Sequence, residues 1–285
     1  MPILLIFLCT VTSTVQNVFR KQFSLRCQGG DYFFNATVSF FALLFFLLTA
    51  DRISFSTEIL PYSVGFAAVF ALATVCLGLA IKTGSLAITS LIISYSLIIP
   101  TLYGFVFLNE KITFLKCGGI LLLLISLFLV RAKAQGEEKS AKPTVKWVIY
   151  LVLAFIANGM CSVIQNAQQR KFDGAHNSNF MILALSLSTG ILLVVSLVLE
   201  GNTVLNTLKK GIVLSAACGI CNGATNYLVM VIIAVVASSV FFPVLSAGGL
   251  VLTFVISLVF YREKFIPRQI VGLACGLVSL VFLNI

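Results

Sequence analysis

The chain has 285 residues, of which 60% are hydrophobic and only 10% are charged, with a formal net charge of +10. A typical globular domain is about 25% charged, so this chain has too little polar surface to cover a water-soluble particle of its size. The composition therefore excludes an ordinary soluble protein and indicates that lipid surrounds most of the chain.

Long runs without Asp, Glu, Lys or Arg predict membrane-spanning helices along the whole chain. A helix needs about 20 apolar residues to cross a bilayer, and the runs do not alternate as the strands of a membrane barrel do. The run 211–261 is too long for one span, so we divide it near Ala234–Ser238. The expected fold is an all-α polytopic membrane protein with ten transmembrane helices, at about 2–20, 32–50, 62–82, 85–108, 113–130, 147–168, 178–199, 211–232, 236–260 and 268–284.

One polar segment, residues 131–146, interrupts this pattern and divides the chain almost in half. It is rich in charge and is expected to be a basic linker between a first half, 1–130, and a second half, 147–285. At the start of the chain, Met1 and Pro2 lead directly into apolar sequence, which favours a retained first helix over a cleaved signal peptide.

The basic residues cluster in the predicted loops, which favours a membrane protein over one that binds nucleic acid along a basic face. The loops on one side hold fourteen of the 19 lysines and arginines. The positive-inside rule places that side, with the linker, in the cytoplasm and both termini outside it. The expected location is the plasma membrane, with the lipid bilayer as partner and no nucleic acid.

The two halves resemble one another weakly. Thr14–Asn17 is similar to Val163–Asn166 at an offset of 149, and Phe107–Lys111 is similar to Phe260–Lys264 at an offset of 153. Each half would contain five helices, and because five is odd, the second half would enter the membrane from the opposite side. The sequence therefore predicts two inverted five-helix repeats, an arrangement that allows exchange between outward-open and inward-open states.

A motif recurs at the end of the fourth helix of each half. Glu110 and Glu263 end these helices, and a glycine follows nine residues later, at Gly119 and Gly272. With ten helices in two halves, the chain resembles the drug/metabolite transporter superfamily, and its EamA-type branch in particular. The resemblance covers the whole chain. It implies a secondary transporter that moves small metabolites or drugs through a central cavity, with the fifth and tenth helices packed at the periphery.

Polar residues inside the apolar helices are the candidate substrate-binding residues, because an unpaired polar group in hydrocarbon costs several kcal/mol. Asn158, Ser162 and Gln165 share one face of their helix, and the repeat offset carries the last two onto Ser13 and Gln16. The other candidates lie in three further helices: Ser90, Ser94, Tyr95, Asn222, Asn226, Tyr227, Pro243 and Ser246. The alternative is structural: interhelical hydrogen bonds, serines bonded to their own backbone, and a packed kink at the proline.

The middle of the predicted spans contains no Asp, Glu, Lys, Arg or His. A multiply charged cargo would lack a counter-charge there, so the expected substrate is a small neutral or zwitterionic molecule, such as an amino acid, a nucleobase or a drug-like compound. Glu110 and Glu263 are expected to pair at the membrane interface with Lys111 and Lys264. An alternative cargo is a lipid-linked intermediate, but a flippase would need cations within the membrane for its phosphate.

The sequence predicts no enzyme and no cofactor or metal. It contains neither an HExxH motif nor a carboxylate pair. Cys218 and Cys221 have the spacing of metal ligands but lack a second pair or a nearby histidine, so we expect them to pack. Gly219 and Gly223 are spaced for close helix contact within the chain, which favours a monomer, with a homodimer as the alternative. A non-transporting membrane subunit is a further alternative.

Overall fold

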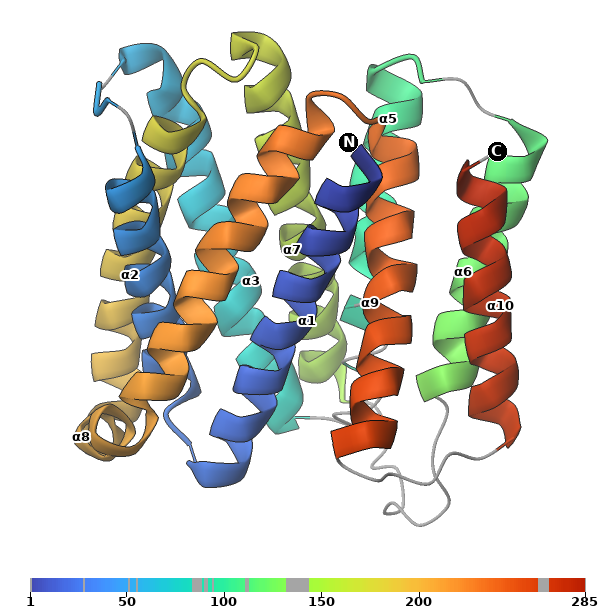
Figure 1. Ribbon diagram of the computed structural model, residues 1–285. Coiled ribbons are helices and arrows are strands. Elements are labelled where there is room, and N and C mark those ends of the chain that lie inside the picture. Colours follow the sequence, from blue (N-terminus) through green and yellow to red (C-terminus); the bar gives the residue numbers. More distant parts are fainter. Residues whose placement is uncertain are drawn as a thin grey trace. The chain divides into compact units, whose positions relative to one another are not determined.

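The computed structural model consists of helices throughout its described residues, where no strand occurs. It describes residues 2–27, 29–50, 52–54, 56–83, 89, 92–93, 95–110, 113–131, 144–260 and 267–284. The α-helices are α1 (Pro2–Arg26), α2 (Asp31–Thr49), α3 (Leu60–Thr83), α5 (Ile98–Phe107), α6 (Phe114–Arg131), α7 (Val145–Phe172), α8 (Asn177–Ile233), α9 (Ser238–Phe260) and α10 (Pro267–Asn284) (Figure 1). Short 3₁₀ helices, Thr57–Ile59 and Tyr95–Leu97, precede α3 and α5.

Within the described residues, six helical segments are long and apolar enough to cross a membrane. They are Pro2–Arg26, Asp31–Thr49, Thr57–Thr83, Val145–Phe172, Asn177–Gly201 and Thr207–Ile233. Shorter apolar helices occupy Tyr95–Phe107, Phe114–Ser126 and Ser238–Gly249. The all-α class and the membrane-length helices are thus confirmed, whereas the full set of ten spans and the inverted repeat stay predictions.

The longest helix, α8, bends at Glu200, whose backbone leaves the helical region with φ −133° and ψ 15°. We call Asn177–Gly201 the first arm of α8 and Thr207–Ile233 the second arm. The chain leaves the helix after Ile233 and resumes helical structure in α9 at Ser238. This break lies where the length of the apolar run required one.

The chain forms two compact units, each drawn from both halves of the sequence. Unit 1 comprises residues 1–78 and 164–235, and unit 2 comprises residues 79–163 and 236–285. The helices α3 and α7 each continue from one unit into the other. The halves 1–130 and 147–285, which the repeat predicts, therefore do not coincide with the compact units.

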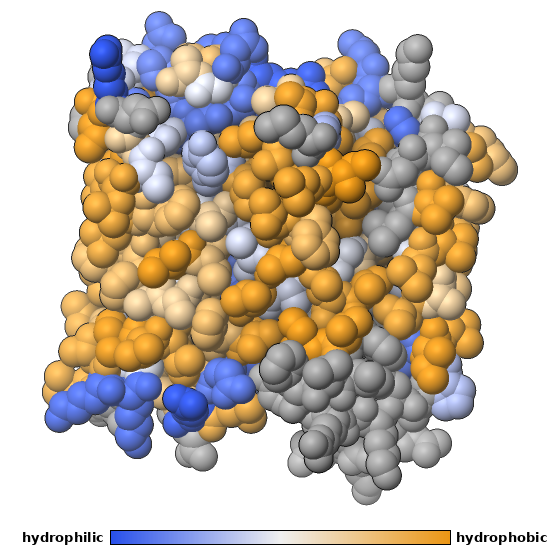
Figure 2. All heavy atoms as spheres, in the orientation of Figure 1, coloured by the Kyte–Doolittle hydropathy of each residue, from blue (hydrophilic) through white to orange (hydrophobic). Residues whose placement is uncertain are grey.

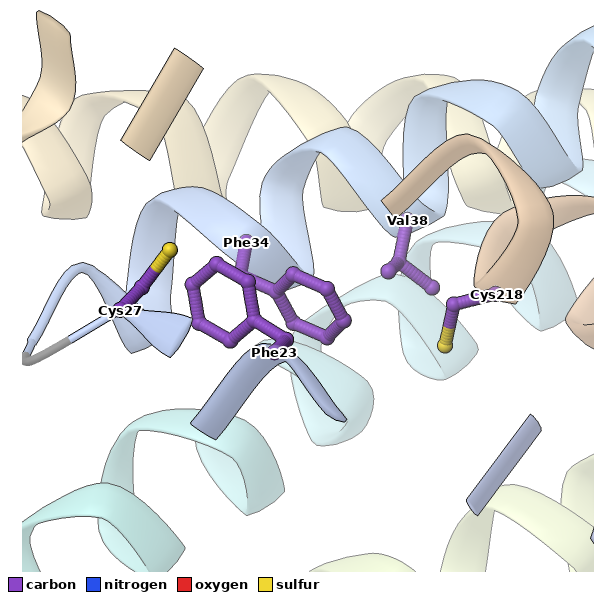
Figure 3. Packing of buried hydrophobic residues seen from close by; sticks show 5 residues of the cluster. All are labelled: Phe23, Cys27, Phe34, Val38 and Cys218. Atoms are coloured by element: carbon purple, nitrogen blue, oxygen red, sulfur yellow. The ribbon is translucent and has the colours of Figure 1, made fainter. Parts of the chain in front are cut away.

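Unit 1 is held together by aromatic and small residues of α1, α2 and α8. Phe23 of α1 stacks on Phe34 of α2 with ring centroids 4.0 Å apart, and Val38 and Cys218 extend the cluster (Figure 3). The second arm of α8 approaches α2 closely because it presents Gly219 there. A Cβ atom at this glycine would lie 2.5 Å from Cβ of Phe41 and 2.6 Å from the carbonyl oxygen of Val38.

Unit 2 has two packing centres. Trp147 of α7 is buried with Leu151 against Ala80, and its indole N–H donates to the hydroxyl of Thr89 at 3.1 Å. The second centre joins α6 and α10, which run side by side (Figure 1). There the hydroxyl of Ser126 donates to the carbonyl oxygen of Gly272 at 2.5 Å. The motif glycine thus lies at a helix–helix contact, where the absence of a side chain permits close approach.

Candidate functional site

Three of the candidate amides form a hydrogen-bonded chain in unit 1. Gln165, on α7, is buried, and its Nε2 donates to Oδ1 of Asn226 on α8 at 2.8 Å. Nδ2 of Asn226 donates in turn to Oδ1 of Asn222 at 3.1 Å and to the backbone carbonyl of Asn222 at 2.9 Å. Gln165 Nε2 also lies 3.9 Å from the sulfur of Met181. The structure therefore brings together three residues that the sequence placed on two separate helices.

The backbone carbonyl of Asn222 fixes the direction of this amide chain. A carbonyl oxygen only accepts, so the amide atom of Asn226 that faces it must be nitrogen. The oxygen of Asn226 then faces Gln165, which must donate, and Asn222 must offer its oxygen to Asn226. At the Asn222 end the remaining group is Nδ2 of this half-buried residue, a double donor without a partner among the described residues. At the other end it is the acceptor Oε1 of Gln165. The chain of amides therefore ends in a donor at Asn222 and in an acceptor at Gln165.

Unit 2 contains a second amide contact, between Asn158 of α7 and Ser96 near the start of α5. Nδ2 of Asn158 donates to the hydroxyl of Ser96 at 2.6 Å, and Ser96 is fully buried. Ser96 was not among the predicted residues, although Ser90 and Ser94 of the same predicted helix were. Gly159, the residue after Asn158, lets α7 approach the backbone at Ser96. A Cβ at this glycine would lie 2.8 Å from the carbonyl oxygen of Ser96.

Three further candidates line a small cavity of unit 2. Tyr95, Pro243 and Ser246 surround it together with Thr101 and apolar residues of α5 and α6. The hydroxyl of Tyr95 donates to the backbone carbonyl of Leu124 at 3.0 Å. The cavity volume is about 20 Å³, which holds about one water molecule. In this conformation these three residues frame a packing gap and not a substrate-sized pocket.

The remaining candidates belong to none of these three groups. Ser13, Gln16 and Ser162 are half-buried, and the backbone carbonyl of Gln16 lies 3.7 Å from the sulfur of Cys218. Tyr227 is 42% exposed and packs on Phe46. Ser90 and Ser94 lie outside the described residues. The structure thus brings Asn158, Gln165, Asn222 and Asn226 into side-chain hydrogen bonds. Their role in substrate binding stays a prediction.

Two carboxylates cap the starts of distant helices, which the sequence did not predict. The two carboxylate oxygens of Glu110 accept from the backbone N–H groups of Ser238 at 2.9 Å and Ser239 at 2.8 Å, at the start of α9. Oε2 of buried Glu200 accepts from the N–H groups of Tyr32 and Phe33 at 3.0 and 3.1 Å, at the start of α2. The expected partner of Glu110, Lys111, lies outside the described residues, as do Glu263 and Lys264.

The turn after α5 is built so that Glu110 can reach α9. Asn109 adopts a left-handed conformation with φ 51°, and the backbone N–H of Glu110 donates to the carbonyl of Gly104 at 3.2 Å. A Cβ at Gly104 would lie 2.6 Å from Oε2 of Glu110. The glycine therefore leaves room for the carboxylate beside the end of its own helix.

Within the described part of the chain, no group of three or more His, Cys, Asp or Glu residues could hold a metal ion. Cys218 and Cys221 are free thiols on α8. Cys218 belongs to the packed cluster of unit 1, as expected for a structural cysteine (Figure 3).

Comparison with known proteins defines the fold alone. No family model matches the chain, and no curated protein does. Among solved structures, one described as "Crystal structure of protein" is similar with a TM-score of 0.79 and 12% sequence identity. The likeness covers 98% of this chain and 94% of that one.

Proposed function

We propose that this protein is a secondary membrane transporter of small neutral or zwitterionic molecules that works by alternating access. The observation that carries the proposal is the amide chain Gln165–Asn226–Asn222 within membrane-length helices. Three adjoining amides stabilise apolar helices only weakly, since one hydrogen bond between membrane helices contributes only about 1 kcal/mol. A donor left open at the end of such a chain is better explained by a polar cargo.

The predicted duplication supports this mechanism. The offset of 153 that relates Glu110 to Glu263 also relates Gly119 to Gly272 and Ser126 to Ser279. Both of these serines and both of these glycines are buried, on α6 and α10, and these helices pack against one another. Recurrence of the same residue types at a helix contact favours a true internal repeat. An inverted repeat would supply the two related conformations that alternating access requires.

The direction of the amide chain determines which polar group the cargo would present to Asn222. Asn222 offers Nδ2, so the cargo would present an acceptor, such as a carbonyl or carboxylate oxygen, to this residue. Hydrogen bonds in a chain polarise one another, which strengthens the terminal donor. Amino acids and nucleobases both carry such acceptors.

The same proposal includes membership of the drug/metabolite transporter superfamily, in its EamA-type branch, because of the glutamate–glycine motif and the ten predicted spans. It also includes a plasma-membrane location with both termini outside the cytoplasm, no enzymatic activity and no cofactor. A lipid-linked intermediate flippase is the less favoured candidate. It would require cations inside the membrane, and the middle of the predicted spans contains none.

Flux through purified protein in liposomes tests the transport function. Liposomes loaded with an equimolar mixture of the twenty amino acids and five nucleobases are sampled over time, and the external compounds are quantified by mass spectrometry. The wild type is expected to release a subset of the mixture. Asn226→Ala removes the central amide and should reduce the initial rate at least about tenfold, because it leaves Gln165 unpaired and separates Asn222 from the chain.

The matched control is Ser186→Ala, on the same helix. The hydroxyl of Ser186 bonds only to the carbonyl of its own helix at Ile182, so its loss should leave flux unchanged. Equal flux from wild-type and empty liposomes for all compounds would overturn the transport proposal. Normal flux through correctly folded Asn226→Ala would remove the amide chain from the transport path.

A further inference from the structure

Unit 1 has an apolar groove of about 230 Å³ between α2 and the two arms of α8. Its lining residues are apolar side chains and two threonines, among them Phe33, Thr37, Phe40, Leu193, Leu208 and Ile212. Several of the lining residues are exposed, among them Phe40, which is 43% exposed, and Leu208, which is 42% exposed. The groove uses a different face of α2 from Phe34 and Val38, which pack in the cluster of unit 1 (Figure 3).

The length of the groove along α2 is close to the thickness of the hydrocarbon part of one membrane leaflet. On α2 its lining runs from Phe33, two residues after the helix begins, to Phe41. These eight steps correspond to about 12 Å at about 1.5 Å per residue. Half of the hydrocarbon core of a bilayer is about 15 Å thick. The groove therefore has the length to hold part of one acyl chain that enters from the end where α2 begins.

Basic side chains collect at that same end of unit 1. Lys209 and Lys210 are exposed and lie between Leu208 and Ile212, which line the groove. The end of α1, with exposed Arg20, Lys21 and Arg26, adjoins them. Phe23 of α1 fixes this placement, because a Cβ at Gly211 would lie 2.6 Å from its ring.

Acidic residues do not cancel this positive charge. Among the described residues near the bend of α8, Glu200 is engaged by the start of α2, and Asp31 is the exposed acid. Figure 2 shows hydrophilic side chains gathered at this bend, next to apolar side chains over the arms of α8. The apolar groove and a group of basic side chains thus lie next to one another on unit 1.

We propose that unit 1 binds an anionic phospholipid of the surrounding bilayer, with one acyl chain in the groove and the headgroup on Lys209 and Lys210. A soluble phosphate would leave the groove empty, and a neutral lipid would leave the lysines without a partner. Each lysine near a membrane surface contributes about fivefold to the binding of an anionic headgroup. The site shares no residue with the amide chain and does not depend on the proposed transport.

Native mass spectrometry of the full-length protein tests this lipid site. The protein is purified in mild detergent with equal amounts of phosphatidylglycerol and phosphatidylcholine of identical acyl chains, and the retained lipid is counted. The wild type should retain phosphatidylglycerol at least about fivefold in preference. Lys209→Gln/Lys210→Gln should lower this preference by at least about fivefold, and Thr37→Phe, which fills the groove, should lower the retention of both lipids.

The control is Arg170→Gln/Lys171→Gln, which removes the same charge from the end of α7, away from the bend of α8. It should retain lipid as the wild type does. If the double lysine variant does not fold, the single Lys209→Gln variant and the salt dependence of wild-type retention replace it. Equal retention of the two lipids, an unchanged preference after loss of the lysines, or unchanged retention in Thr37→Phe would each overturn the site. So would a dimer that Thr37→Phe dissociates, because a second copy would then occupy the groove.

Discussion

Glu200 supplies from another helix the cap that the start of α2 lacks. The residue before α2 is Gly30, which has no side chain and a left-handed φ of 81°. Side chains with oxygen acceptors normally satisfy the first N–H groups of a helix, and a negative charge there also favours the helix dipole. Because Glu200 also stands at the bend of α8, its carboxylate joins the bend to α2.

We expect Glu200→Ala to lower the free energy of unfolding by about 1–2 kcal/mol, because it leaves two buried N–H groups without an acceptor. Glu200→Gln keeps one acceptor oxygen and should cost less. Equilibrium unfolding in mixed micelles, followed by circular dichroism, measures both. Exposed Glu58 provides the comparison, and Glu58→Ala should change stability by less than about 0.5 kcal/mol. An equal loss in the Glu58 and Glu200 variants would contradict the capping role.

Close contact between α2 and the second arm of α8 depends on residue size. Gly219 faces the backbone of α2, and Gly223 faces Phe45, whose Cβ would lie 2.8 Å from an added Cβ. Backbone atoms cannot move aside as the end of a flexible side chain can. By contrast, Gly190 on the first arm of the same helix has open space around the position of a Cβ.

Substitution by alanine should therefore have opposite effects on stability at Gly219 and at Gly190. Gly219→Ala should destabilise the protein by about 1–3 kcal/mol through overpacking against Val38 and Phe41. Gly190→Ala should stabilise it by about 0.4–1 kcal/mol, because alanine reduces the freedom of the unfolded chain without a clash. Thermal unfolding in one detergent measures both variants. Destabilisation of similar size in both would show that helix propensity and space at these sites do not decide the outcome.

Across the whole molecule, each compact unit takes helices from both halves of the sequence. Unit 1 contains α1 and α2 from the first half and α8 from the second. Unit 2 contains α5 and α6 from the first half and α9 and α10 from the second. Inverted repeats whose helices intermix in this way would tie the two halves together, so that neither half could fold as an independent domain.

The predicted topology places the linker 131–146 on the opposite side of the membrane from both termini. Five spans in each half require this result, and an even number would put the linker and the termini on the same side. Alkaline phosphatase, active only outside the cytoplasm, and green fluorescent protein, fluorescent inside it, can be fused in turn at the C-terminus and within the linker. We expect phosphatase activity at the C-terminus and fluorescence in the linker. Fluorescence at both sites would exclude an inverted repeat.

The sequence by itself determined where the long helices lie. In lipid the backbone must satisfy its own hydrogen bonds, so an apolar run of sufficient length can only be a helix. This constraint located α7, both arms of α8 and the break before Ser238. It also identified Gln165, Asn222 and Asn226 as polar residues that need partners.

Only the tertiary structure decided which of these residues meet. Gln165 and Asn226 are 61 positions apart, and Glu200 is 168 positions from Tyr32, so their contacts depend on which helix faces turn toward one another. In an almost uniformly apolar chain, hydrophobic periodicity does not distinguish an inner from an outer helix face. Close packing contributes to that choice, because Gly219 lets the backbone of α2 approach and Gly211 leaves room for the ring of Phe23.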